Sequence, residues 1–168
     1  PKTVVDARVA DGTLSTERLR TLADQGGHLG ASQAFAALLK EHEGSVTFMR
    51  DATRGGLSAV LNEWARSSRV CIEIEEDAVK ICDEVRGICE IFGFEAMDFA
   101  NEGTFMLAVA PESAEAAMSI LHRFGFCENA SIIGRVSQKY TAKVVLRSSY
   151  GSSRFLDLPK GELLPRIC

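Results

Sequence analysis

Two polar, glycine-containing segments and one terminal thiol are the parts of this 168-residue sequence whose residue types suit chemistry. The first segment, RDATRGGL, occupies residues 50–57 and joins a predicted strand to a predicted helix. Gly55 and Gly56 let the backbone turn tightly and bring its N–H groups close to a ligand, while the helix directs the positive end of its dipole there. Arg54 adds a planar guanidinium suited to phosphate. This pattern favours an anion-binding turn.

The same segment allows a simpler interpretation, which the residues alone leave open. Asp51 and Thr53 are residue types that cap helices, and two glycines often mark an ordinary turn. The P-loop pattern GxxxxGK[ST] is absent from the sequence.

The second segment is FANEGTF, residues 99–105, in which Glu102 is predicted to lie in a polar turn just before a buried strand. A carboxylate in that place would be half desolvated, which raises its pKa and makes it a better base. Asn101 and Gly103 would support this turn. The alternative is a plain surface turn, in which Asn101 and Gly103 serve only the backbone conformation.

Cys168, the last residue, is the thiol that packing explains least, because a chain end has neighbours on one side only. The segment from Pro159 to Cys168 can extend about 33 Å, enough to carry the thiol across one face of a domain. Arg166 would favour the thiolate and the terminal carboxylate would disfavour it. We expect the other four cysteines to be buried in the core, with Cys71 assigned less firmly than the rest: Cys71, Cys82, Cys89 and Cys127.

The composition of the chain excludes several classes of protein. The odd number of cysteines, five, and the absence of CxxC argue against a disulfide framework or a zinc ribbon, so we expect reduced thiols, a cytoplasmic location and no metal site. The net charge of −4 gives no reason to expect nucleic acid, and no apolar run approaches the roughly 20 residues that span a bilayer. The sequence begins PKTVVDARVADG, without a signal-peptide pattern or an initiator Met, which indicates a fragment or a processed product.

The hydrophobic pattern predicts alternating strands and helices. In the predicted helix 83–93, we expect Val85, Ile88, Cys89 and Phe92 to face inward. The closing strands, joined by a short turn, are expected to make the sheet mixed, which gives an α+β fold rather than a dinucleotide-binding fold. The predicted helices are 15–27, 31–44, 56–68, 83–93 and 111–125, and the predicted strands are 46–50, 70–76, 104–110, 130–138 and 142–149.

With the motifs RDATRGGL, VRGICEIFGF, FANEGTFMLAV, IIGRV and the closing LPRIC, the sequence from about residue 38 to its end resembles the C-terminal half of the HypE family of hydrogenase maturation factors. That family belongs to the superfamily of aminoimidazole ribonucleotide synthetase, selenophosphate synthetase and thiamine monophosphate kinase. The resemblance implies a mixed sheet packed with helices, like the C-terminal domain of aminoimidazole ribonucleotide synthetase, with a flexible C-terminal tail. We therefore divide the chain into a poorly matched lead (1–30), a synthetase-like C-terminal domain (31–150) and a tail (151–168).

The resemblance also implies an activity, that of an ATP-dependent carbamoyl dehydratase in [NiFe]-hydrogenase maturation. In that family the carbamoyltransferase HypF loads a carbamoyl group onto the C-terminal cysteine. HypE dehydrates this group to a thiocyanate, and the cyanide passes to the active-site iron through a HypC–HypD complex. Transferred by motif, Cys168 is the carrier thiol and Glu102 the acid/base candidate. The residues that would face the nucleotide phosphates are Asp51, Thr53, Arg54, Gly55 and Gly56.

The sequence also departs from the family. The N-terminal domain, which would hold most of the ATP and Mg²⁺ and form the core of a homodimer, is missing, and Thr104 stands where the family often has Lys. We therefore expect a C-terminal domain that is inactive alone. Three alternatives stay open: a selenophosphate synthetase-like enzyme of the same superfamily, a non-catalytic thiol-carrier and docking module, and a small regulatory module with an incidental cysteine.

Overall fold

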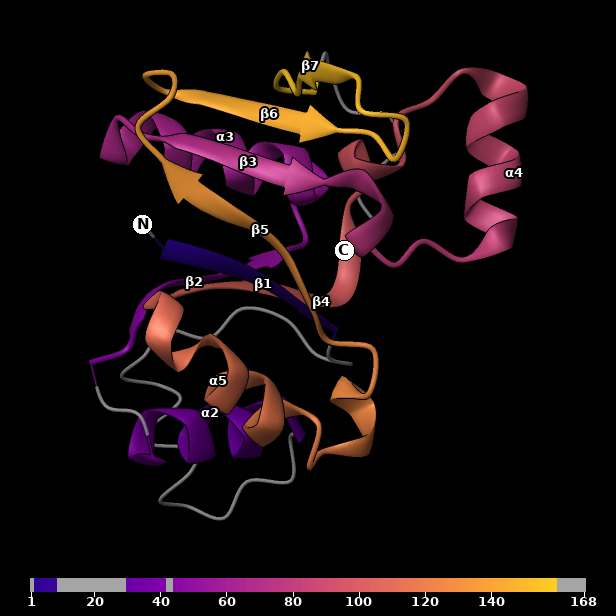
Figure 1. The fold of residues 1–168 in the computed structure, drawn as a ribbon. Coiled ribbons are helices and arrows are strands. Elements are labelled where there is room, and N and C mark those ends of the chain that lie inside the picture. Colours follow the sequence, from indigo (N-terminus) through magenta and orange to yellow (C-terminus); the bar gives the residue numbers. More distant parts are fainter. Residues whose placement is uncertain (1, 9–29, 42–43, 160–168) are drawn as a thin grey trace.

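The structure is a computed structural model that describes residues 2–8, 30–41 and 44–159, and its centre is one seven-stranded sheet (Figure 1). The strands follow the order β2-β4-β1-β5-β3-β6-β7. Neighbouring strands are antiparallel except β3 and β6, which are parallel, so the predicted mixed sheet and α+β fold are confirmed. The strands are β1 (Lys2–Arg8), β2 (Val46–Ala52), β3 (Cys71–Glu75), β4 (Asn101–Val109), β5 (Ser131–Ser137), β6 (Lys143–Arg147) and β7 (Ser153–Phe155).

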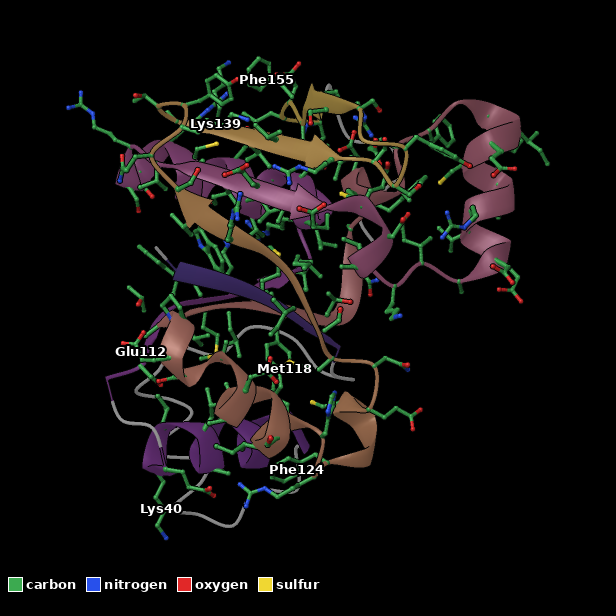
Figure 2. The ribbon with its side chains drawn as sticks, viewed as in Figure 1. Lys40, Glu112, Met118, Phe124, Lys139 and Phe155 are labelled. Carbon is green, nitrogen blue, oxygen red and sulfur yellow. The ribbon has the colours of Figure 1, made fainter. Side chains whose placement is uncertain are left out.

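Helices α2 (Gly30–Glu41) and α5 (Ala114–Leu121) pack against one face of the sheet. Alternate residues of β4, namely Phe105, Leu107 and Val109, supply the sheet side of this core, as expected for a strand whose side chains alternate between faces. Figure 2 shows Met118 and Phe124 in this lower layer of the molecule, where both belong to the cluster around α5.

Helix α3 (Gly56–Ser68) covers the opposite face and has the bounds predicted from its apolar spacing. Its side chains Leu57, Leu61 and Trp64 pack with strand residues of the same face, among them Met106 of β4 and Ile72 of β3. The core is therefore two layers of apolar side chains separated by the sheet, and β4 contributes to both.

Three features of the sheet differ from the sequence-based prediction. Lys2–Arg8, within the residues that we assigned to a lead, forms β1 between β4 and β5. The closing strands β5 and β6 do not pair with each other, because β3 lies between them. Ser153–Phe155, within the expected tail, forms the edge strand β7, and Leu156 after it is buried. These pairings depend on contacts between distant segments, which local periodicity does not report.

The prediction for α4 (Asp83–Phe92) is correct in position but wrong in orientation. Cys89 is the one buried residue of this helix, whereas Val85, Ile88 and Phe92 are exposed. Figure 1 shows α4 standing apart from the sheet at the right of the molecule. An amphipathic pattern identifies an apolar face but does not say that the same domain covers it.

The remaining elements are short. The helix predicted over 111–125 is a 3₁₀ turn, η3 (Pro111–Ser113), followed by α5, which ends at Leu121. The other 3₁₀ turns are η1 (Glu76–Ala78), η2 (Ala96–Asp98) and η4 (Gly125–Cys127). The helix predicted over 15–27 lies outside the described residues.

The four cysteines expected in the core divide three to one. Cys71, Cys89 and Cys127 are buried, as predicted, and the prediction is wrong for Cys82, which is exposed at the start of α4. No helix among the described residues is long and apolar enough to cross a membrane.

Candidate functional site

The two glycine-containing motifs meet where β2 ends and β4 begins. These strands pair antiparallel, and Ala52 of the first motif lies opposite Asn101 of the second. The register shifts here, because the preceding residue Asp51 lies opposite Phe105, so residues 102–104 of β4 face no residue of β2. Such an irregularity bends a strand and often re-aims side chains beside functional sites.

The predicted turn around Glu102 is wrong, because Asn101, Glu102 and Gly103 are the first three residues of strand β4. Antiparallel pairing with β1 reaches Thr104, and pairing with β2 extends the strand back to Asn101. The side chain of Glu102 lies outside the part of the chain that the structure describes. What the structure establishes is that the residue before Glu102, Asn101, pairs with Ala52 at the end of β2.

The Gly55–Gly56 turn has a conformation and a packing that require glycine. Both residues are left-handed, with φ of +67° and +63°. A Cβ atom added to Gly56 would lie 2.3 Å from the carbonyl oxygen of Met97 and 2.5 Å from that of Phe99. The backbone of the turn therefore packs directly against η2, the segment that leads into β4.

The amino-terminal end of α3 opens at this turn without a side-chain cap. Its N-cap is Gly55, so neither Asp51 nor Thr53 caps the helix as the simpler interpretation proposed. The first turn of α3 carries no acidic residue. Asp51 and Thr53 are half-buried and Arg54 is exposed, so the predicted phosphate-facing residues surround a helix end whose amide dipoles favour an anion.

Two polar side chains with a buried oxygen, which sequence reasoning missed, lie beside the same turn: Ser58, which is buried, and Asp98, which is half-buried. Neither the Ser58 hydroxyl nor one carboxylate oxygen of Asp98 has a hydrogen-bond partner among the described residues, although both atoms are buried. Burial raises the pKa of Asp98, and the nearby Ser58 hydroxyl offsets part of this rise. A serine in the first turn of α3, beside Leu57, was the one available signal in the sequence.

The last residues that the structure describes before position 160 lie beside this turn. Leu156 is held by two hydrogen bonds, from its N–H to the Val144 carbonyl at 3.0 Å and from the Asn62 side chain to its own carbonyl at 2.9 Å. Three residues later, Pro159 Cγ lies 3.7 Å from the position of a Cβ on Gly55. Cys168 itself lies outside the described residues.

No group of three or more His, Cys, Asp or Glu side chains suited to a metal ion occurs among the described residues. Among the described residues, the structure brings together at one turn a helix amino terminus, two buried oxygens without a hydrogen-bond partner, and Pro159. The helix amino terminus and the Ser58 hydroxyl can donate to an anionic ligand, whereas the Asp98 carboxylate oxygen is an acceptor and does not contribute to binding an anion.

The mixed sheet and its glycine turn describe a class of domain, and comparison with known sequences identifies this class. The sequence profile "AIR synthase related protein, C-terminal domain" matches residues 24–147, and the chain belongs to this family. Within it, the chain is similar to the Carbamoyl dehydratase HypE of Escherichia coli K12, at 42% identity over 123 residues. That match covers 73% of the chain and 36% of the relative, so the chain spans about a third of the relative's length.

Solved structures agree with this assignment. Hydrogenase maturation protein HypE in complex with ATP superposes with a TM-score of 0.77 at 27% identity, covering 99% of this chain and 52% of that one. A HypE–HypF complex gives a TM-score of 0.75 at 26% identity, covering 94% of this chain and 53% of that one. Both superpositions take in nearly the whole chain, which supports the described fold.

Proposed function

We propose that this chain is the C-terminal, thiol-bearing domain of a carbamoyl dehydratase that makes the cyanide ligand for [NiFe]-hydrogenase. The reaction removes the oxygen of an S-carbamoyl group on Cys168 and two protons from its nitrogen, which leaves a thiocyanate. The observation that carries this proposal is that Pro159 adjoins Gly55. The segment that ends in Cys168 thus begins at the turn that resembles a phosphate site.

The reach of this segment fits the proposal. The nine residues beyond Pro159 extend about 30 Å at most. Strand β4 begins near the same turn, because its first residue, Asn101, pairs with Ala52. A thiol on such a tether can enter its own cleft for dehydration and leave it for loading and delivery. A cysteine fixed in the core cannot visit separate partners in this way.

The residues at the turn fit a nucleotide phosphate. The uncapped amino terminus of α3 offers N–H groups, and the buried Ser58 hydroxyl has no partner among the described residues. Bound ATP would phosphorylate the carboxamide oxygen, which turns a poor leaving group into a good one. The similar HypE solved with ATP supports this assignment. We place Mg²⁺ and most of the ATP contacts on an N-terminal domain.

The remaining roles belong to this chain's own residues. Glu102 accepts protons from the carboxamide nitrogen as the oxygen leaves; it follows Asn101, which pairs with Ala52 at the end of β2, and this supports the assignment. Arg54, which makes no ion pair with a described residue, binds phosphate oxygens. Asp51, Thr53 and the two glycines shape the turn, and water must be excluded because the carbamoyl group hydrolyses.

The proposed partners follow from the reaction. A HypF-type carbamoyltransferase loads Cys168, and a solved complex of the similar HypE with HypF supports this pairing. A HypC–HypD complex receives the cyanide, and the protein with its N-terminal domain acts as a cytoplasmic homodimer. The chain alone carries the thiol without turning over.

One experiment tests the carrier role. The chain is incubated with the carbamoyltransferase, ATP and carbamoyl phosphate, and the mass of the C-terminal peptide is measured. A carbamoyl adduct on Cys168 is expected, and Cys168→Ser should remove it while Cys82→Ser, at an exposed cysteine of the described fold, should not. An unmodified Cys168 in the presence of active transferase refutes the carrier role.

A second experiment tests the base. In a protein that joins this chain to an N-terminal domain, Glu102→Gln should still accept the carbamoyl group but should stall before the thiocyanate. Glu112→Gln is the matched control, because Glu112 is an exposed carboxylate in η3, which follows the opposite end of β4 from Glu102. Dehydration at the normal rate in Glu102→Gln would show that another group is the base.

A further inference from the structure

Helix α4 presents an apolar face that the described part of the molecule leaves open. Ile88, Ile91 and Phe92 are exposed by 50%, 78% and 65%, and Val85 by 36%. Spacings of three and four residues place these side chains on one side of the helix. A face of this kind, on a helix that stands apart from the sheet (Figure 1), marks an interaction surface.

This apolar face is continuous with the exit of the C-terminal segment. The ring of Phe92 stacks on Phe94 at 5.7 Å, and Phe94 meets Phe99 edge-on at 5.8 Å. The carbonyl of Phe99 packs against Gly56, and Pro159 lies beside Gly55. A row of aromatic rings thus joins the point where the described chain ends to the surface of α4.

A polar hollow of about 310 Å³ lies between the end of helix α4 and the residues that precede Pro159. Gly93 and Phe94, at the end of α4, form one wall, and residues 154–158 form the other. Three carboxylates line it, from Glu95, Asp98 and Asp157, against one cation, Arg154. Because Arg154 is already paired with Glu95 and Glu76, the hollow carries excess negative charge.

The sequence that follows Pro159, KGELLPRIC, matches this surface in order and in chemistry. It starts with the cation Lys160, suited to the acidic hollow, and continues with the apolar Leu163, Leu164 and Ile167. Four residues reach about 13 Å from Pro159 to Leu163, and five more reach about 17 Å from Leu163 to Cys168. Ten residues of α4 measure about 15 Å, so Leu163 at the end of the helix would bring Cys168 near its start.

We propose that residues 160–168 dock on α4, with Lys160 in the hollow, the three apolar side chains on the open face and Cys168 beside Cys82. Cys82 is the N-cap of α4 and is exposed. The docked position is a second destination for the thiol, away from the turn at Gly55. It depends only on the unmodified chain and not on the proposed dehydratase activity.

Oxidative cross-linking tests the proposal. Diamide takes two electrons and two protons from the thiols of Cys82 and Cys168, whose sulfur atoms form one disulfide while diamide becomes the hydrazine. Peptide mass analysis of the full chain should find the Cys82–Cys168 disulfide within single chains. Leu163→Asp/Leu164→Asp should slow its formation about tenfold, because it removes the local concentration that docking provides. Glu162→Gln, the matched tail control, should not.

Variants on the helix complete the test. Ile91→Asp should slow the cross-link about as much as the tail variant, whereas the neighbouring Glu90→Gln should leave it unchanged. Cys71, Cys89 and Cys127 do not compete, because all three are buried. Circular dichroism of each variant confirms that the chain is folded.

Hydrogen exchange supplies a readout that involves no cysteine. If residues 160–168 are docked about nine-tenths of the time, the α4 amides of the full chain exchange about tenfold more slowly than those of a chain that ends at Pro159. Equal exchange in the two chains overturns the proposal. So does a cross-link that forms between chains, or protection that grows with protein concentration, because a second copy would then cover α4.

Discussion

The contact between Gly56 and η2 makes a quantitative prediction about stability. In Gly56→Ala the new Cβ would lie 2.3 Å from the Met97 carbonyl oxygen and 2.5 Å from that of Phe99. Both neighbours are backbone atoms, and Met97 is fully buried, so η2 must shift to make room. We expect about 1–2 kcal/mol for the left-handed backbone and about 1–3 kcal/mol for the overpacking.

Gly93→Ala separates these two costs. Gly93 has nearly the same φ, +68°, but no atom lies within 4 Å of the position of its Cβ. Gly93→Ala should therefore lower the free energy of unfolding only by the cost of the left-handed backbone, about 1 kcal/mol. Gly56→Ala should lose about 2 kcal/mol more than Gly93→Ala, and should melt several degrees lower.

The measurement is urea unfolding of both variants and the parent chain, with the free energies extrapolated to water. Equal losses in the two variants would refute the reasoning, because the contact with η2 would then contribute nothing. A change in the slope of the transition would indicate an altered unfolded state and would call for thermal melts as a second estimate.

Three further predictions concern other parts of the fold. A hydrogen bond from Ser137, with help from Arg135, lowers the pKa of Glu73. The ionised Glu73 therefore stabilises the fold above its ordinary pKa of 4.5, and this contribution falls as the pH drops further. In urea unfolding at pH 7 and pH 4, the stability of Glu73→Gln should lack this contribution to the pH dependence. Asn62→Ala should lower the free energy of unfolding by about 1–3 kcal/mol, because it removes the side chain that donates to the Leu156 carbonyl. An unchanged free energy of unfolding would contradict this prediction. Burial raises the pKa of Cys127 to about 11, so at pH 8 iodoacetamide should label Cys82 and spare Cys127, as peptide masses can show.

The local hydrophobic pattern was enough to predict the elements that are buried in the core at the sheet. Helix 56–68 was predicted to the residue because its apolar spacing coincides with a glycine start and full burial against the sheet. The strand around Phe105 was equally clear, because both faces of β4 are buried and the run is continuously apolar. In these segments the local preference and the tertiary environment agree.

Long-range pairing decided what local pattern missed. The segment Lys2–Arg8 became a central strand because β4 and β5 offer it two edges. The segment at Asn101 became strand rather than turn because β2 pairs with it, and the apolar side of α4 stayed open because no described element packs there. None of these outcomes is encoded in the spacing of residues within the segment itself.

For the candidate site, the sequence by itself determined the chemical groups. It supplied two glycines able to turn, a guanidinium, a carboxylate after an asparagine, and a thiol at the end of the chain. Only the tertiary structure decided that the first two motifs adjoin and that the C-terminal segment departs beside Gly55. The physical reason is that side-chain chemistry is local, whereas proximity arises from sheet pairing and packing between residues that are about fifty to a hundred positions apart.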